Sequence, residues 1–215
     1  MRIGIEINNI LRDINKQVIK YYKKEIDNDL NEKDINLNVL NVSDSLKFKS
    51  KKDKFNFMYV DYPYEIFGCA KTMDTYLAVK LNNWIIELSN REDDKYDVKL
   101  FSLLEEGLSI QSTYYFLSKI GCRVREILFP KNGKYMWDSC EVIITTNENI
   151  VKNKPKKAVV VLIRKEDNVN LLDKVDLEYN SLLEIIEDKN FISKVNILLN
   201  NKISFFEKIK KYFKI

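Results

Sequence analysis

The sequence contains no histidine among its 215 residues. A Ser-His-Asp or Cys-His catalytic arrangement is therefore excluded, and a zinc site would have to use cysteine and carboxylate ligands alone. The three cysteines, Cys69, Cys122 and Cys140, lie far apart and are odd in number. That pattern fits neither a disulfide framework nor a CxxC metal motif. We expect buried free thiols and a cytoplasmic protein in a reducing compartment.

The chain is also poor in proline and glycine, with three and five residues, while 45% of its residues are hydrophobic. This composition excludes a disordered protein and allows one substantial core. The apolar runs, such as residues 158–163, are too short to cross a bilayer, and we expect no signal peptide because a strand pattern begins directly after Arg2. With 36 basic and 32 acidic residues, the net charge is +4, which gives no strong nucleic-acid signal.

Short and nearly continuous apolar runs bounded by polar residues are typical of strands buried on both faces of a parallel sheet. The clearest run is the β-branched segment AVVVLI. The segments that we predict to be strands are residues 3–7, 98–104, 124–129, 142–145 and 158–163.

Segments with helical spacing separate these strands. Apolar residues recur every three or four positions over residues 14–26, 74–88 and 109–120, with Ser109 as the expected N-cap and Gly121 as the expected C-cap of the last. The C-terminal third is predicted to be helical, and residues 203–215 place five large apolar side chains on one face. Alternating strands and helices predict an α/β fold of the Rossmann-like type, with three layers around a parallel sheet.

The long interval after the first helix has a different character. Residues 38–54 are polar and rich in lysine, which predicts a loop, and residues 59–67 are aromatic. We therefore predict an α/β core formed by residues 1–21 and 96–215, with residues 22–95 inserted as a helical cap. Parallel sheets bind ligands beyond the carboxyl ends of their strands, where Glu6, Ser102 and Thr145 are expected to lie.

The stretch IGIEINNILRD at residues 3–13 resembles the first motif of the haloacid-dehalogenase-like (HAD) superfamily, a strand followed by Asp-x-Asp-Gly-Thr-Leu. Glu6 stands at the position of the nucleophilic Asp, and Asn8 at that of the general acid/base Asp. Leu11 and Asp13 match the pattern.

Later segments extend the resemblance to the nucleotidase-like branch of this superfamily. In that family a second strand ends in a Ser or Thr that binds phosphoryl, as Ser102 would here, and a Lys neutralises the phosphoaspartate, a position that Lys131 or Lys134 could occupy. The fourth motif is a strand ending in acids that hold Mg²⁺, but residues 142–147 end in Thr145, Thr146 and Asn147 without an acid.

The missing acids weaken the implied chemistry. Mg²⁺ prefers oxygen ligands that include one or two carboxylates, and of the expected acids only Glu6 is left, with Asn8, Thr145 and Asn147 as weaker metal-ligand candidates. The extra methylene of Glu6 would displace its carboxylate, and Asn8 cannot serve as a general acid or base. Glu6 could instead pair with Lys131 or Lys134 in a vestigial cleft.

The leading hypothesis is therefore a HAD-like pseudoenzyme without a cofactor that binds a protein partner or forms a homo-oligomer, for instance as a viral structural component in a virion. Its candidate contact surfaces are the C-terminal helix and the aromatic residues Tyr59, Tyr62, Tyr64 and Phe67. One alternative is a Mg²⁺-dependent phosphatase or 5′-nucleotidase-like hydrolase that uses Glu6. Another is a nucleotide or phosphate binder that uses Ser102, Lys131, Lys134 and the backbone N–H groups of the helix at Ser109.

Overall fold

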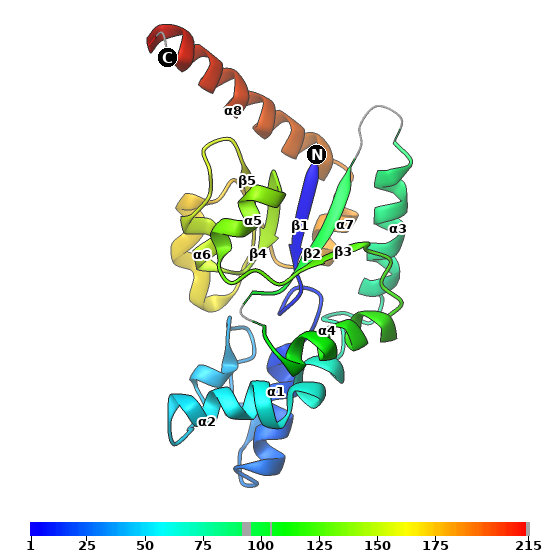
Figure 1. Cartoon of the computed structure of the whole chain (residues 1–215), viewed down its shortest axis with the longest axis vertical. Coiled ribbons are helices and arrows are strands. Elements are labelled where there is room, and N and C mark those ends of the chain that lie inside the picture. The colour runs from blue at the N-terminus through cyan, green and yellow to red at the C-terminus, as the bar shows by residue number, and fades with distance from the viewer. Residues whose placement is uncertain (92–95, 104, 214–215) are drawn as a thin grey trace.

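Six parallel strands form one sheet in the order β3-β2-β1-β4-β5-β6 (Figure 1). The computed structural model describes residues 1–91, 96–103 and 105–213, with side chains up to residue 202. The strands are β1 (Arg2–Glu6), β2 (Asp97–Phe101), β3 (Glu126–Leu128), β4 (Val142–Thr145), β5 (Val159–Ile163) and β6 (Leu177–Tyr179). The α/β fold with a parallel sheet is thus confirmed.

Helices follow most strands and cover both faces of the sheet. They are α1 (Ile14–Glu25), α2 (Lys51–Asn56), α3 (Leu77–Ser89), α4 (Leu108–Lys119), α5 (Gly133–Ser139), α6 (Glu148–Lys152), α7 (Leu182–Glu187) and α8 (Phe191–Phe213). Short 3-10 turns span Glu32–Asp34, Val42–Asp44 and Glu166–Lys174, and π-helical turns span Phe57–Asp61 and Tyr64–Gly68. Within the described residues, no helix is both long and apolar enough to span a membrane.

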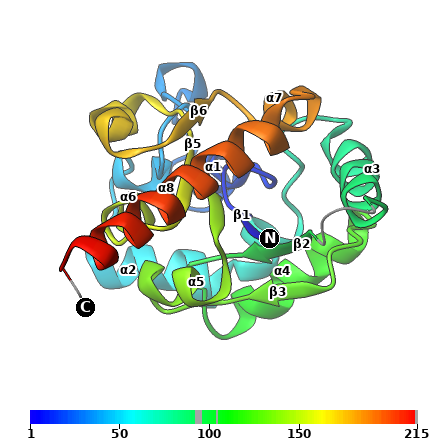
Figure 2. The same ribbon diagram turned by 90° about the horizontal axis from the view of Figure 1, so that it is seen from above.

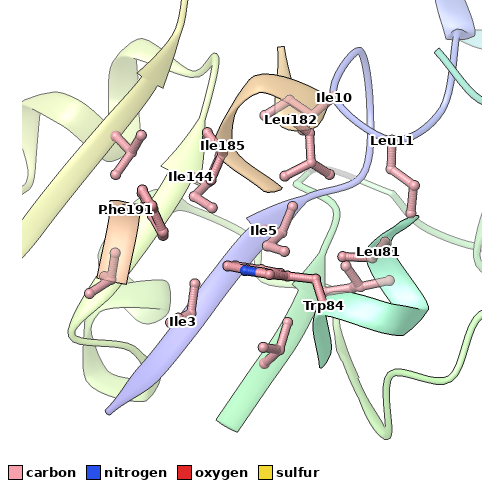
Figure 3. Close-up of a cluster of buried hydrophobic side chains, with 14 of the residues drawn as sticks. Ile3, Ile5, Ile10, Leu11, Leu81, Trp84, Ile144, Leu182, Ile185 and Phe191 are labelled. Atoms are coloured by element: carbon pink, nitrogen blue, oxygen red, sulfur yellow. The ribbon is translucent and has the colours of Figure 1, made fainter. Parts of the chain in front are cut away.

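The two faces of the sheet build two separate apolar clusters. On one face, Ile3 and Ile5 of β1 pack with Trp84 of α3, Leu182 of α7 and Phe191 of α8 (Figure 3). The other face packs against α5 and α6; its cluster includes Phe101, Met136, Trp137, Ile143, Ile150, Val160 and Leu162. Because both faces are covered, β4 and β5 are buried at every position, without alternation.

Gly4 lets α5 approach β1 closely. A Cβ atom at this position would lie 3.0 Å from Cys140 Sγ and 3.3 Å from Met136 Cε. Cys140 is buried, Cys69 and Cys122 are half-buried, and all three are free thiols. The cysteines are free as expected, but the expectation that they are buried holds for Cys140 alone.

A third cluster lies beyond the carboxyl ends of the strands, in the lobe at the bottom of Figure 1. Its buried members are Ile14, Val18, Ile19, Tyr22, Val42, Phe57, Met58, Ile66 and Phe67. Helix α1 therefore belongs to this outer cluster, whereas α3 packs on the sheet. The domain boundaries at residues 22 and 95 stay a prediction.

Several local expectations need correction. The predicted loop at residues 38–54 contains a 3-10 turn, and α2 begins within it because the Ser50 side chain accepts a hydrogen bond from Asp53 N. Gly107, and not Ser109, is the N-cap of α4. At the other end, Ile120 is the C-cap, and Gly121 follows it with φ +63°, the left-handed position usual for a helix-ending glycine. Residue 104, the end of the second predicted strand, and the apolar face predicted for residues 203–215 lie outside what the structure describes.

Helix α8 crosses the amino-terminal edge of the sheet (Figures 1 and 2). Lys202 fastens it there, because its Nζ donates 2.8 Å to the carbonyl oxygen of Ala158 and 2.5 Å to Asp176 Oδ1. This leaves the opposite, carboxyl edge of the sheet facing the outer cluster.

Candidate functional site

The strand order places a topological switch point between β1 and β4. From β1 the chain winds towards β2 and β3, and then returns to β4, β5 and β6 on the other side. Doubly wound sheets bind their ligands outside the carboxyl ends of the strands at such a point. Glu6 is the last residue of β1 and Thr145 is the last residue of β4, so both lie at the expected place.

Glu6 is held by two threonines that follow each other on β4 and its exit. Its Oε2 accepts hydrogen bonds from Thr145 Oγ1 at 2.7 Å, from Thr146 N at 2.8 Å and from Thr146 Oγ1 at 3.1 Å. Glu6 is therefore anchored by hydroxyl and amide donors, and not by Lys131 or Lys134 as one interpretation of the sequence had it.

The charge of Glu6 is costly at this depth. The side chain is 6% exposed, and burial raises the pKa of its carboxyl above 4.5, while the bonds from Thr145 and Thr146 pull the pKa back down. Desolvation disfavours the ionised carboxylate, and hydrogen bonds to it favour ionisation. A buried carboxyl with a raised pKa at a switch point is a functional-site candidate on physical grounds.

Asn8 and Ser102 also come together, but in a network that the sequence did not reveal. Asn8 Nδ2 donates to Ser102 Oγ at 3.0 Å, and Asn8 Oδ1 accepts from Arg12 Nε at 3.0 Å. Arg12 forms an ion pair with Glu105, and both side chains are completely buried. The Ser102 hydroxyl donates to the same Glu105 carboxylate at 2.5 Å.

The guanidinium of Arg12 is enclosed on every side that the structure describes. Its Nη1 donates to Thr113 Oγ1 at 2.6 Å and to the carbonyl oxygen of Phe67 at 3.1 Å. Its Cζ lies 5.1 Å from the ring centroid of Phe67 and 5.3 Å from that of Phe116. Burial lowers the pKa of Arg12, and Glu105 raises it again. The cation is therefore a fixed part of the interior.

A tight turn after β1 delivers Arg12 to this position. Asn9 has a φ of +58°, a left-handed conformation that asparagine tolerates better than most residues. The N–H groups of Leu11 and Arg12 both donate to the carbonyl oxygen of Ile7, and Asn9 Nδ2 donates 2.7 Å to Leu40 O. The turn folds the chain back over the edge of the sheet, with Arg12 pointing inwards.

The remaining predicted site residues lie elsewhere. Lys131 and Lys134 are exposed on the loop after β3 and on α5. Asn147 is the N-cap of α6, and its side-chain oxygen accepts from Asn149 N at 2.8 Å. Of the aromatic residues expected at a contact surface, Tyr64 is 46% exposed, whereas Phe67 is fully buried, so that expectation was wrong for Phe67.

Sequence reasoning passed over Arg12, Glu105, Thr113 and Lys165. Arg12 directly follows the apolar pair Ile10-Leu11 in the first motif, which was the signal that could have found it. Lys165 follows β5 at the same carboxyl edge and is 6% exposed. Burial lowers the pKa of its ammonium, and the charges of Asp13 and Asp167 raise it.

Several of the oxygen atoms proposed as ligands for a hard cation already accept hydrogen bonds. Glu6 Oε2, Asn8 Oδ1 and Asn147 Oδ1 each accept hydrogen bonds from the protein. Among the described residues, no cluster of three or more His, Cys, Asp or Glu side chains is arranged to hold a metal ion. The geometry is that of a satisfied polar core.

Comparison of the chain with protein-family models and with curated proteins gave no match.

Proposed function

We propose that this chain is a HAD-like pseudoenzyme that acts as a binding or assembly protein. The observation that carries the proposal is the completely buried Arg12, which pairs with Glu105 and holds the side-chain oxygen of Asn8. A phosphotransfer site of the type that the sequence resembles needs an acid near Asn8 and a cation-binding cluster of oxygen ligands. At this place the guanidinium binds the side-chain oxygen of Asn8 and neutralises the Glu105 carboxylate, so that both groups are already used within the protein.

Its proposed partner is another protein chain, either a second copy or a component of a larger particle such as a virion. We place it in the reducing cytoplasm, because Cys69, Cys122 and Cys140 are free thiols. Size-exclusion chromatography with light scattering tests self-association. A protein that stays strictly monomeric at high concentration would exclude a second copy of the chain as the partner.

An activity assay decides between this proposal and the hydrolase alternative. Purified protein is incubated with 4-nitrophenyl phosphate and with 5′-nucleotides in the presence of Mg²⁺, alongside a Glu6→Gln variant as the matched control. We expect no turnover above that of the variant. Mg²⁺-dependent hydrolysis that disappears in Glu6→Gln would refute the pseudoenzyme and establish the hydrolase.

Thermal-shift measurements test the alternative of phosphate or nucleotide binding without hydrolysis. A ligand that binds only the folded state raises the melting temperature. Inorganic phosphate and a nucleoside monophosphate are the two probes. We expect neither to cause a rise in melting temperature that depends on Lys131 and Lys134. A shift that is lost in the Lys131→Ala/Lys134→Ala variant would favour the binder.

A further inference from the structure

The outer cluster contains a cavity that no part of the proposed function uses. It has a volume of about 470 Å³ and lies between α2, the π-helical turn at Phe57–Asp61 and the segment before α2. Its apolar wall includes Phe48, Phe55, Met58 and Tyr59. Pockets of 300–1,000 Å³ with aromatic walls and a few polar groups are typical of small-molecule sites, and π-helical turns occur frequently at functional sites.

A series of aromatic contacts, whose last pair is stacked, ends at this cavity. The Phe55 and Tyr59 rings are stacked, with centroids 5.0 Å apart and an interplanar angle of 29°. The ring centroids of Tyr59 and Phe67 lie 5.4 Å apart, with an interplanar angle of 32°. The buried Arg12 guanidinium lies over the Phe67 ring. Phe55 lines the cavity and is 41% exposed. This series of contacts therefore begins deep in the interior and ends with the stacked pair, whose Phe55 ring is reached by solvent.

Positive charge lies at the rim of the same cavity. Lys51, Lys54 and Asp44 all line it, and Lys54 is paired with Asp44. This pairing leaves the charge of Lys51 in excess at the mouth. A ligand that extends the stack would gain from aromatic contact, and an anionic group on it would face the lysine.

We infer that this cavity is a binding site for a small planar aromatic anion, whose ring stacks on Phe55 and whose charge faces Lys51. Stacking on Phe55 favours a flat ring over an aliphatic group. The excess positive charge of Lys51 favours an anion over a neutral arene. The site is separate from the carboxyl edge at Glu6 and does not depend on the proposed loss of phosphotransfer.

Titration calorimetry with three probes tests the chemistry of the ligand. The probes are 2-naphthalenesulfonate, the neutral 2-naphthol and the non-aromatic cyclohexanesulfonate. We expect saturable one-to-one binding of 2-naphthalenesulfonate, with the other two probes weaker by at least about 3-fold. Absence of saturable binding, or equal affinity for all three probes, would overturn the inference.

Two matched pairs of variants locate the site. Phe55→Ala is compared with Tyr76→Ala, since Tyr76 is 69% exposed and does not line this cavity. Lys51→Ala is compared with its neighbour Lys52→Ala, which is also exposed but does not line it. We expect the affinity for 2-naphthalenesulfonate to fall about 3- to 10-fold in the first member of each pair and to stay unchanged in the second. Equal losses within a pair, with equal melting temperatures for all four variants, would show that the probe binds elsewhere.

Discussion

At the scale of single residues, Arg12 determines the character of the carboxyl edge. Its ion pair with Glu105 is completely buried, and such pairs are stable only when the remaining hydrogen-bonding capacity is satisfied. The remaining hydrogen bonds of Arg12 are accepted by the side chains of Asn8 and Thr113 and by the carbonyl oxygen of Phe67. No buried polar side-chain atom among the described residues is left without a hydrogen-bond partner. The network is therefore a structural unit whose parts depend on each other.

Replacing Arg12 should expose this dependence. We expect Arg12→Met to lower the free energy of unfolding by about 3–5 kcal/mol, because the Glu105 charge is left buried without a counter-ion. Adding Glu105→Gln should recover a large part of the loss. Urea unfolding followed by circular dichroism measures both, with Lys16→Met as the control, because the Lys16–Asp13 pair has one exposed partner and should cost under about 1 kcal/mol. Additive losses in the double variant would contradict a coupled pair.

Glu6 should make stability depend on pH in one direction. Its pKa is above 4.5 in the folded protein because of burial, so between 4.5 and the folded pKa the folded state holds more protons than the unfolded state. Stability must then fall as the pH rises through this window and level off above it. Glu6→Gln cannot titrate, so its stability relative to the native chain should increase over the same window. Urea unfolding from pH 4 to pH 8 checks this, and a constant difference would refute the pKa shift.

At the scale of elements, Asp176 joins three parts of the chain. It directly precedes β6, its Oδ2 accepts from Val160 N of β5 at 2.8 Å and from Lys154 at 2.9 Å, and its Oδ1 accepts from Lys202 of α8. Burial alone would raise the pKa of its carboxyl, but the bonds from Lys202, Val160 and Lys154 outweigh burial and lower it. The attachment of α8 therefore depends on an ionised Asp176.

We expect Asp176→Asn to lower the free energy of unfolding by about 1.5–3 kcal/mol at neutral pH, as for hydrogen bonds to charged groups. In the native chain the same stabilisation is present above pH 3.8 and is lost as the pH falls through the lower, folded pKa. Hydrogen exchange of α8 amides should accelerate in the variant. Glu187→Gln is the control, because its pair with Lys80 is exposed on both sides; equal effects of the two changes would contradict the role of Asp176.

At the scale of the whole molecule, a loop contact is one of those that join the outer cluster to the sheet, beside the Arg12–Phe67 and Lys119–Gly68 hydrogen bonds. Both oxygens of Asp167 accept from Leu40 N at 3.0 Å, and Glu166 N donates to Asn38 O at 3.0 Å. Asp167 belongs to the 3-10 turn that follows β5, whereas residues 36–40 belong to the outer lobe. This contact holds the lobe over the carboxyl edge.

Asp167→Ala should loosen the lobe without unfolding the sheet. We expect faster hydrogen exchange at residues 36–40 and unchanged exchange in β4 and β5, because local contacts can open independently of the core. Asp173→Ala, an exposed position in the same 3-10 turn, is the control and should leave residues 36–40 unchanged. Faster exchange throughout β4 and β5 would mean that lobe and sheet unfold as a single unit.

The sequence predicted the strongly patterned elements and missed the short ones. The five predicted strands all appear in the sheet, although β2 ends at Phe101 and β3 is limited to Glu126–Leu128. The prediction was clearest for β4 and β5, which are buried at every position. Strand β6 and helices α5 and α6 have three, seven and five residues, which is too short for a period to be read. Their positions follow from contacts with distant segments, such as the bond from Trp137 Nε1 to Ile150 O.

The candidate site also has one part that the sequence predicted and another part that it did not. The sequence by itself determined that β1 and β4 are buried strands, and hence that Glu6 and Thr145 lie at the carboxyl edge of the sheet. That the two strands are neighbours, so that the two side chains meet, was decided by the strand order. Only the tertiary structure decided that Arg12 is buried and reaches Glu105, 93 residues away. A charged residue is expected at the surface unless it finds a partner, and no local pattern shows a partner at that separation. Periodicity reports which face a residue occupies, whereas a buried ion pair depends on how distant segments are brought together.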